Sequence, residues 1–424
     1  MAPLLAEQAA LAEKDRRATD NVIEALRRAG LFQMMFPRRS GGVGHKLITQ
    51  IETIAALAQG CPGTAWAFGL LTGVTASAAS MSPEIKQLIF RNGDELVCSV
   101  AGQIGTARPT NGGFAVDDTW AYASGCLHAT WALNGVRIFD EQGLQIDAGF
   151  AFLPLAGPDV MIEDTWHMSG LCASGSNTVV ARNAVVPENL VLRFSQLRAA
   201  ASRTPASALE PRDRWPVEPL FPLGVLAPML GAAEAMLELI KTNMPKRPTI
   251  GWKYANQAES QTMVGQLGEA ALEIDSAWLH VRRAVAVIDE TAQTRTLSGF
   301  EKAQIQADCG YAMRQLRRAG ERLMEIGGPG AFAESSPLQR LWRDLSVGTR
   351  HTALNTMLSS ELYGRALLQQ DSNLTLLNDI RQAAARIRQQ LLLAGCGTTV
   401  TDTACTAFQP IFYTPSLDSE STVT

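Results

Sequence analysis

The stretch Gly112–Trp131, GGFAVDDTWAYASGCLHATW, decides how the rest of the chain is interpreted. An Asn-Gly-Gly turn signal leads into it, and Phe114–Trp120 then has the β-type residues and spacing of a strand. Near its end, Ser124 and Gly125 place a hydroxyl beside a residue that has no side chain, so a planar ligand could lie against the backbone. His128 follows a few residues later. We interpret this stretch as the wall of a cofactor pocket.

The composition is that of a large folded protein. Of 424 residues, 46% are hydrophobic and 18% are charged, which is unlike a disordered chain. The net charge of -4 argues against a general nucleic-acid binder. The seven cysteines show no CxxC spacing, and no metal-ligand spacing is evident, so we expect reduced thiols and no metal site. A signal peptide and a membrane-spanning run are not evident either, which predicts a cytoplasmic protein with no membrane partner.

The periodicity of the hydrophobic residues changes twice along the chain, and it predicts an α+β fold. The order is an N-terminal helical domain, a middle antiparallel β-domain and a C-terminal helical bundle. The expected boundaries are 1–93, 94–197, a connecting loop at 198–222, 223–394, and a partly disordered tail at 395–424. The expected helices of the bundle are 223–243, 254–290, 300–326, 337–369 and 375–393. The expected strands are Leu96–Val100, Phe114–Trp120, Tyr122–Gly125, His128–Leu133, Ile146–Leu153 and Val179–Val186.

Several short motifs occur in a fixed order along the body of the chain. They are a Gly-Leu…Pro…Gly-Gly segment at 30–42, Cys61–Trp66 (CPGTAW), Trp120–Ala129 (WAYASGCLHA), Gly170–Ser176 (GLCASGS), Arg247–Gly251 with Gln257, Ile326–Gly330, and Arg343-Asp344 with His351. In this order they resemble the acyl-CoA dehydrogenase superfamily, and within it the two-component flavin-dependent monooxygenases that hydroxylate phenols and steroid phenols or oxidise dibenzothiophene. The resemblance covers about residues 21–368.

The resemblance implies positions for a flavin. Tyr122, Ser124 and Gly125 would line the isoalloxazine ring, while Ser174 and Ser176 would hold the flavin side chain or phosphate. The phosphate and nucleotide end of the flavin would lie against Arg247 and Gln257. A partner subunit would contribute Gly327 and Gly328 to the same end. An arginine suits this position because its guanidinium donates to a phosphate in a fixed fork.

One departure from the dehydrogenases bears on the reaction. Where many of them have a tyrosine and then a catalytic glutamate, this chain has His351 and Thr352. Threonine cannot act as the base that abstracts an α-proton. We therefore expect His351 to serve oxygen chemistry, by donating a hydrogen bond or deprotonating a phenol, with His128 as a second candidate and Ser124 beside the flavin. Each histidine also has a structural interpretation, as a core or subunit-contact residue.

The resulting hypothesis is a monooxygenase that uses O2 and reduced FMN or FADH2 from a separate NAD(P)H flavin reductase. It would hydroxylate an aromatic or polycyclic molecule through a flavin C4a-hydroperoxide, and the family implies a homotetramer, or at least a dimer. Trp66 and Trp131 would wall the substrate, unless they are core residues, and His45 would lie at its entrance. The alternatives are N- or S-oxygenation, an acyl-CoA dehydrogenase, and a homologue that has lost flavin and activity.

Overall fold

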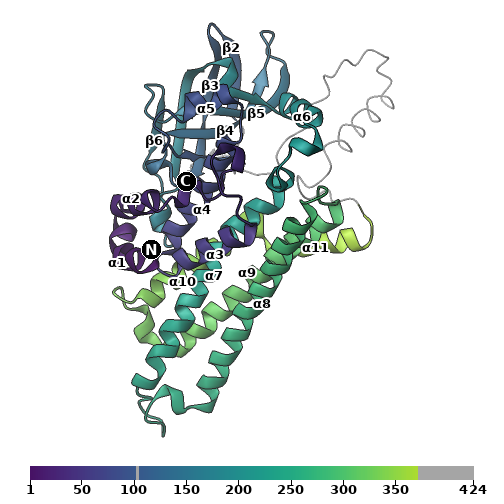
Figure 1. Cartoon of the computed structure of the whole chain (residues 1–424). Helices are drawn as coiled ribbons and strands as arrows, with labels where there is room; N and C mark the ends of the chain where they lie inside the picture. Colours follow the sequence, from purple (N-terminus) through teal and green to yellow (C-terminus); the bar gives the residue numbers. More distant parts are fainter. Residues whose placement is uncertain (102–104, 371–424) are drawn as a thin grey trace, which may run out of the picture.

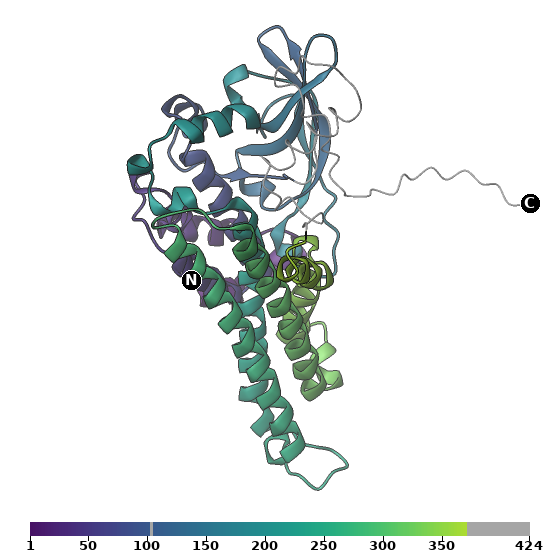
Figure 2. The ribbon, with the colours of Figure 1, turned by 90° about the vertical axis from the view of Figure 1, so that its right-hand side faces the viewer.

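The structure is a computed structural model that describes residues 1–101 and 105–370. The sheet lies at one end, the long C-terminal helices extend away from it, and the N-terminal helices pack beside the junction (Figures 1 and 2). This arrangement confirms the predicted α+β fold with a helical N-terminal part, a β-sheet and a helical bundle. The exact domain boundaries stay predictions.

The N-terminal part is built around one buried helix. The helices are α1 (Ala2–Lys14), α2 (Asp20–Arg28), α3 (Leu47–Ala58), α4 (Pro62–Ala79) and α5 (Pro83–Ile89). Helix α4 starts with proline at its first position, where no backbone donor is lost. Its small and apolar residues allow burial on nearly all sides, and it packs against α3, α7 and the sheet strand β1. Trp66 on this helix is buried. Helix α4 therefore connects the N-terminal part with the other two.

The sheet has eight strands in the order β6-β7-β3-β2-β4-β5-β8, with β1 paired to β4. Strands β1 and β2 pair with β4 in parallel, and the remaining pairs are antiparallel. The strands are β1 (Val97–Cys98), β2 (Gly105–Thr110), β3 (Gly113–Ala123), β4 (Trp131–Phe139), β5 (Gln145–Pro154), β6 (Val160–Glu163), β7 (Asn177–Val186) and β8 (Val191–Arg193).

Strand β3 changes direction just before the predicted pocket. Its inward residues Phe114, Val116 and Trp120 are buried, as the alternation predicts. The register with β7 then shifts between Trp120 and Ala123, where Tyr122 adopts a positive φ of 66°. Such a shift bends a strand and redirects the side chains that follow. The bend leads the chain directly into Ser124.

Helix α6 (Phe194–Arg203) packs on strands β5 and β8. The helices of the C-terminal part are three long ones, α7 (Val217–Asn243), α8 (Gln261–Thr291) and α9 (Gly299–Gly327), and two shorter ones, α10 (Pro337–Gly348) and α11 (Thr356–Leu367). The segment Glu218–Lys246, essentially α7, is apolar and long enough to cross a membrane by composition, but 67% of its apolar window is buried inside the protein. We interpret α7 as the core helix of the bundle.

Three element predictions were wrong. The predicted connecting loop 198–222 is too long, because α6 extends to Arg203 and α7 begins at Val217. His128 is not in a strand but ends the short 3-10 helix η3 (Cys126–His128), since Gly125 adopts a left-handed turn. The predicted helix 337–369 is two helices, broken between Gly348 and Thr356. The predicted helix 375–393 and the tail 395–424 lie outside the described residues.

A buried aspartate fixes the sheet to the bundle. The Leu171 backbone N–H donates to Oδ1 of Asp344 on α10 at 2.5 Å, and Leu171 has a positive φ of 55°. A Cβ on Gly170 would lie 2.3 Å from the Arg343 carbonyl oxygen, so the two backbones are in direct contact. Burial raises the pKa of Asp344 to about 7. The contact holds the loop that leads into Ser174 and Ser176.

The first prediction concerns Asp344→Asn, which keeps the acceptor oxygen and removes the titration. Because the folded-state pKa exceeds the unfolded value, Asp344 binds more protons when folded, and the wild-type protein loses stability as the pH rises from about 4 to 7. The difference in free energy of unfolding between the variant and the wild type should therefore rise in favour of the variant, by roughly 1–3 kcal/mol, when the pH is raised from 4.5 to 7.5. Urea titrations at both pH values measure this, with the exposed Asp275→Asn as control. A gain that is the same at both pH values would contradict the assignment.

Candidate functional site

Trp66 contacts two residues that are far from it and from each other in the sequence, Ser124 and His351. Its indole Nε1–H donates to the Ser124 hydroxyl at 3.2 Å, and its ring centroid lies 5.7 Å from that of His351. Trp66 lies on α4, Ser124 follows β3, and His351 lies between α10 and α11. The predicted flavin-contacting serine and the predicted catalytic histidine are thus joined through one buried side chain.

The serines form a buried chain of hydroxyls. Ser124 Oγ lies 2.7 Å from Ser176 Oγ, which lies 2.7 Å from Ser174 Oγ. Three hydroxyls supply three protons, but only two contacts join them, and Trp66 can only donate. Among the described residues, one of the three hydroxyl protons therefore has no acceptor. A ligand with acceptor atoms on its edge, as the isoalloxazine of a flavin has, fits this requirement.

The backbone around Ser124 is held in unusual conformations. Tyr122 (φ 66°) and Gly125 (φ 75°) both lie in the left-handed region, and the Gly125 N–H donates to the Ser174 carbonyl at 2.9 Å. A Cβ at Gly125 would lie 2.7 Å from Leu71 on α4. The Tyr122 ring is exposed and meets Trp166 edge to face, with centroids 6.0 Å apart. These contacts bring the turn close to α4 and leave the Tyr122 ring open to a ligand.

His351 occupies the break between α10 and α11. Its ring packs between Trp66 and Phe221, whose centroid lies 5.5 Å away. Nδ1 accepts a hydrogen bond from the Ala353 N–H at 3.2 Å. The proton of a neutral imidazole is therefore assigned to Nε2, which makes no hydrogen bond to the described residues. Nε2–H is available to donate to a ligand.

Burial lowers the pKa of His351 to about 4. The imidazole is consequently neutral at physiological pH, and it can donate a hydrogen bond without carrying a charge. In this tautomer it is a donor and not a base, because the Ala353 N–H occupies the acceptor nitrogen. This geometry favours the first of the two roles expected for His351.

His128 faces a different part of the protein. Its side chain is buried, its Nδ1 lies 3.8 Å from Asp20 at the start of α2, and its Nε2 has no partner among the described residues. Burial, with a smaller contribution from Arg17, lowers its pKa to about 4. The structure describes no contact between His128 and Ser124, Trp66 or His351. His128 therefore lies at the junction between the β-sheet and α2.

Of the predicted substrate residues, only Trp66 joins this group. Trp131 begins β4 and packs edge to face on Phe152, with centroids 6.5 Å apart. His45 is exposed before α3 and has no described partner. Neither is placed beside His351 within the described part of the chain.

The residues predicted for the phosphate end meet within one chain, at the far end of the bundle, so the expectation that the glycines come from a different subunit than Arg247 is wrong. Arg247 Nη1 donates to the Gly327 carbonyl at 2.6 Å, and Gln257 Nε2 donates to the Ile326 carbonyl at 2.9 Å. Gln257 Oε1 is buried without a partner, and Gly328 has a positive φ with open space beside it. The unpartnered amide oxygen fits a hydroxyl donor, as a sugar or ribityl chain has. The α7–α8 connection that carries Arg247 lies at the end of the bundle remote from the sheet (Figures 1 and 2).

Sequence reasoning missed three residues that shape the site. Phe221 lies within the range expected to be a loop, and its packing on His351 becomes visible only once α7 is known to begin at Val217. Leu71 had no signal beyond a buried helix position. Asp344 belonged to a quoted motif, but its hydrogen bond to the Leu171 backbone leaves no trace in residue spacing.

Family models match both helical parts of the chain. The "Acyl-CoA dehydrogenase, N-terminal domain" model matches residues 2–90 and the "Acyl-CoA dehydrogenase, C-terminal domain" model matches residues 223–356. The solved structure of XiaF from Streptomyces sp., in complex with FADH2 and glycerol, is 32% identical with a TM-score of 0.83, and the match covers 88% of this chain and 94% of XiaF. The chain belongs to the flavin-dependent monooxygenase branch of the acyl-CoA dehydrogenase superfamily.

Curated relatives of this monooxygenase have the same extent. The oxygenase subunit HsaA of a flavin-dependent monooxygenase from Rhodococcus jostii is 28% identical, over 85% of this chain and 94% of HsaA. The oxygenase component of an FADH(2)-dependent resorcinol hydroxylase from Rhizobium sp. is 29% identical, over 87% of this chain and 92% of that component. The monooxygenase thus matches these oxygenase components along nearly their whole length.

The second prediction tests the turn of the monooxygenase at Gly125. Gly125→Ala would add both the cost of a positive φ, about 1 kcal/mol, and a clash with Leu71 of about 1–3 kcal/mol. Gly112→Ala is the matched control, because Gly112 also has a positive φ (94°) but open space around it. The free energy of unfolding in urea should fall further for Gly125→Ala than for the control. Equal losses would show that Leu71 does not pack against the turn as described.

Proposed function

We propose that this chain is the oxygenase component of a two-component system, which uses O2 and reduced flavin from a separate NAD(P)H flavin reductase to hydroxylate an aromatic small molecule. The observation that carries the proposal is that Trp66 donates a hydrogen bond to Ser124 and packs against the ring of His351. The relatives named as oxygenase components of hydroxylases support the aromatic substrate and the reductase. The proposal extends to a cytoplasmic homotetramer.

The residues of the chain fit a flavin at two ends. If Ser174 donates to Ser176 and Ser176 donates to Ser124, the Ser124 hydroxyl proton is free for the ring, beside the exposed face of Tyr122. Arg247 and Gln257 offer a guanidinium and an unpartnered amide oxygen to the phosphate and sugar end. A bound reduced flavin supplies the electrons that activate O2. We propose that Gly327 and Gly328 act at that second end, and that the two ends of one flavin site come from different subunits.

His351 holds a proton where the substrate would bind. Its Nε2–H can donate to the oxygen of a phenolic substrate and stabilise negative charge as it develops there. Trp66 and Phe221 pack against the imidazole and restrict its orientation. To act as a base instead, His351 would have to give up the hydrogen bond from Ala353.

An acyl-CoA dehydrogenase is the second candidate, and the site argues against it. That reaction needs a base over the substrate, but Thr352 begins a 3-10 turn where many dehydrogenases have the glutamate. The imidazole beside it is a donor in the described tautomer. Oxidation of a nitrogen or sulfur atom would use the same Nε2–H donor of His351. Which atom is oxidised is therefore decided by the substrate that binds.

The third prediction concerns the histidine. His351→Ala should lower hydroxylated product per NADH consumed roughly 10–100-fold while hydrogen peroxide rises, because a positioned donor is lost. His351→Gln, which keeps a donor, should recover part of the yield. Product is measured by chromatography with a supplied flavin reductase and a panel of phenols. In the wild type, the yield should show no inflection near pH 6.5 from this residue, because its pKa is about 4.

The control for this experiment is His280→Gln on α8, away from Trp66 and Ser124. It should retain the wild-type product yield. Unchanged coupling in His351→Ala would remove the histidine from the mechanism. Reduction of enzyme-bound flavin by acyl-CoA thioesters, without hydroxylated product from any phenol, would overturn the monooxygenase assignment.

The fourth prediction concerns flavin binding. Arg247→Gln should weaken the affinity for reduced FMN about 10–100-fold, as expected for loss of a charge-assisted hydrogen bond to phosphate. The measurement is anaerobic equilibrium dialysis, with the exposed Arg91→Gln as the matched control. Because Arg247 also donates to Gly327, the free energy of unfolding is measured in parallel. Equal affinities for both variants would place the phosphate elsewhere.

A further inference from the structure

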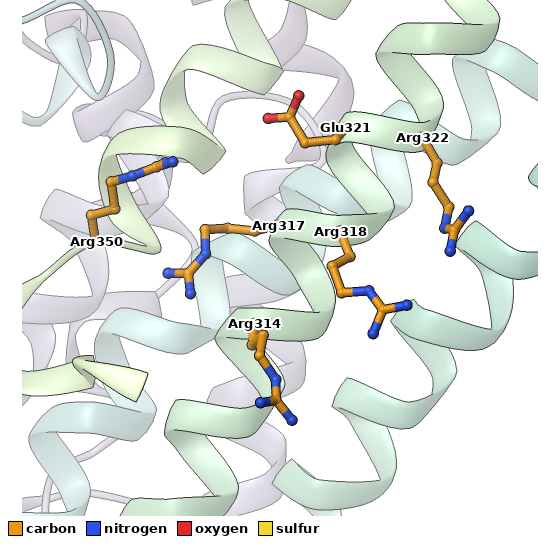
Figure 3. A pocket seen from close by; sticks show the side chains of 6 residues that line it. All are labelled: Arg314, Arg317, Arg318, Glu321, Arg322 and Arg350. Atoms are coloured by element: carbon orange, nitrogen blue, oxygen red, sulfur yellow. The ribbon is translucent and has the colours of Figure 1, made fainter. Parts of the chain in front are cut away.

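Five arginines gather around one hollow on the outer face of α9. The hollow has a volume of about 380 Å³, within the range of small-molecule sites, and one carboxylate also lines it. Figure 3 shows the side chains extending from α9 and from Arg350, two residues beyond the end of α10. The six lining residues, here called the arginine cluster, are Arg314, Arg317, Arg318, Glu321, Arg322 and Arg350.

The positive charge of the cluster is only partly compensated. Arg318 and Arg322 both pair with the buried Glu273, at 3.0 and 3.1 Å. Glu321 accepts a hydrogen bond from the Trp342 indole at 3.0 Å. The other three guanidiniums, described next, form no ion pair within residues 1–101 and 105–370.

The three remaining arginines use uncharged partners. Arg314 stacks on the Tyr311 ring at 4.5 Å, and Arg350 donates to the carbonyl of Ser346, one turn back in α10, at 2.7 Å. Arg317 donates to the Thr349 carbonyl at 2.6 Å. Burial lowers the pKa of Arg317, and Arg350 and Arg314 lower it further by repulsion. An anion in the hollow would relieve that repulsion.

We propose that the arginine cluster is a binding site for a diphosphate group. Arginine forks match phosphate oxygens, and several of them around one hollow suit an anion with more than one charge. The diphosphate could belong to a free molecule, such as a nucleoside diphosphate, or to the dinucleotide form of the flavin. Arg247 and Gln257 are not part of the cluster, so its arginines are additional to the residues proposed above for the flavin.

The cluster also reaches the segment that carries His351. Arg317 donates to the Thr349 carbonyl and to the Thr356 hydroxyl at 3.1 Å, on both sides of the break between α10 and α11. Arg350 directly precedes His351. An anion that draws these guanidiniums toward itself would change how firmly the segment is held. This coupling rests on the proposed function, whereas the binding site itself does not.

The test is isothermal titration of inorganic pyrophosphate into the full-length, flavin-free protein. Arg314→Gln/Arg350→Gln should weaken binding at least tenfold, because it removes two guanidiniums that have no ion pair to lose. Arg91→Gln, at an exposed arginine outside both the cluster and the proposed flavin site, should bind as the wild type does. Binding that is absent from the wild type, unchanged in the double variant, or lost in Arg247→Gln instead would overturn the proposal.

Titrations of FAD and FMN identify the source of the diphosphate. If the double variant loses affinity for FAD but not for FMN, the cluster holds the flavin dinucleotide. If it loses pyrophosphate and keeps both flavins, the cluster holds a separate effector. Both outcomes support the site, and both are independent of hydroxylation. A failure of the monooxygenase assignment would appear in the product assay and leave these binding data unchanged.

Discussion

The site depends on one buried indole. Trp66 donates to Ser124 on one side and contacts the His351 ring on the other, so α4, the sheet and the α10–α11 connection must all be in place before the site exists. Helix α4 can hold an indole there because Gly125 lets the turn approach Leu71, and Gly63 lets the loop at Ala173 and Ser174 approach the helix. Close packing of this kind transmits small displacements to its neighbours. Each part of the fold therefore contributes to the position of the histidine.

Two further hydrogen bonds fix the position of the serine loop and the tautomer of His351. Asp344 accepts from the Leu171 backbone, which brings the serine loop to α10, only a few residues before His351. The Ala353 N–H holds Nδ1 of His351 and so determines which nitrogen carries the proton. Burial keeps that imidazole uncharged, since removing it from water disfavours the cation. The contacts that bury His351 and hold its ring therefore also determine its protonation state.

The sequence was sufficient for the fold class, because three regions differ clearly in hydrophobic period and the motifs occur in a family order. It also predicted Ser124, Trp66 and His351 as site residues; the structure places these three in contact, and their roles stay predictions. It could not show that α10 and α11 are separate, because the apolar spacing continues through the break. The break is set by tertiary contacts, in which Arg317 and Gln306 of α9 donate to the carbonyls of Thr349 and Ala353. Strand β2 was missed for a related reason: GTARPT has no alternation, and its place is fixed by its neighbours β3 and β4.

The separation of the two candidate flavin ends has a consequence for assembly. Helix α7 has 27 residues, a length of roughly 40 Å, and the connection that bears Arg247 lies at its far end from the sheet. Under the proposed function, a ring beside Ser124 and a phosphate beside Arg247 belong to one cofactor only if two subunits meet. Flavin would then bind the assembled form better than the single chain, and mass action makes each event favour the other. A reduced flavin delivered from outside would stabilise the assembly that shields it from water.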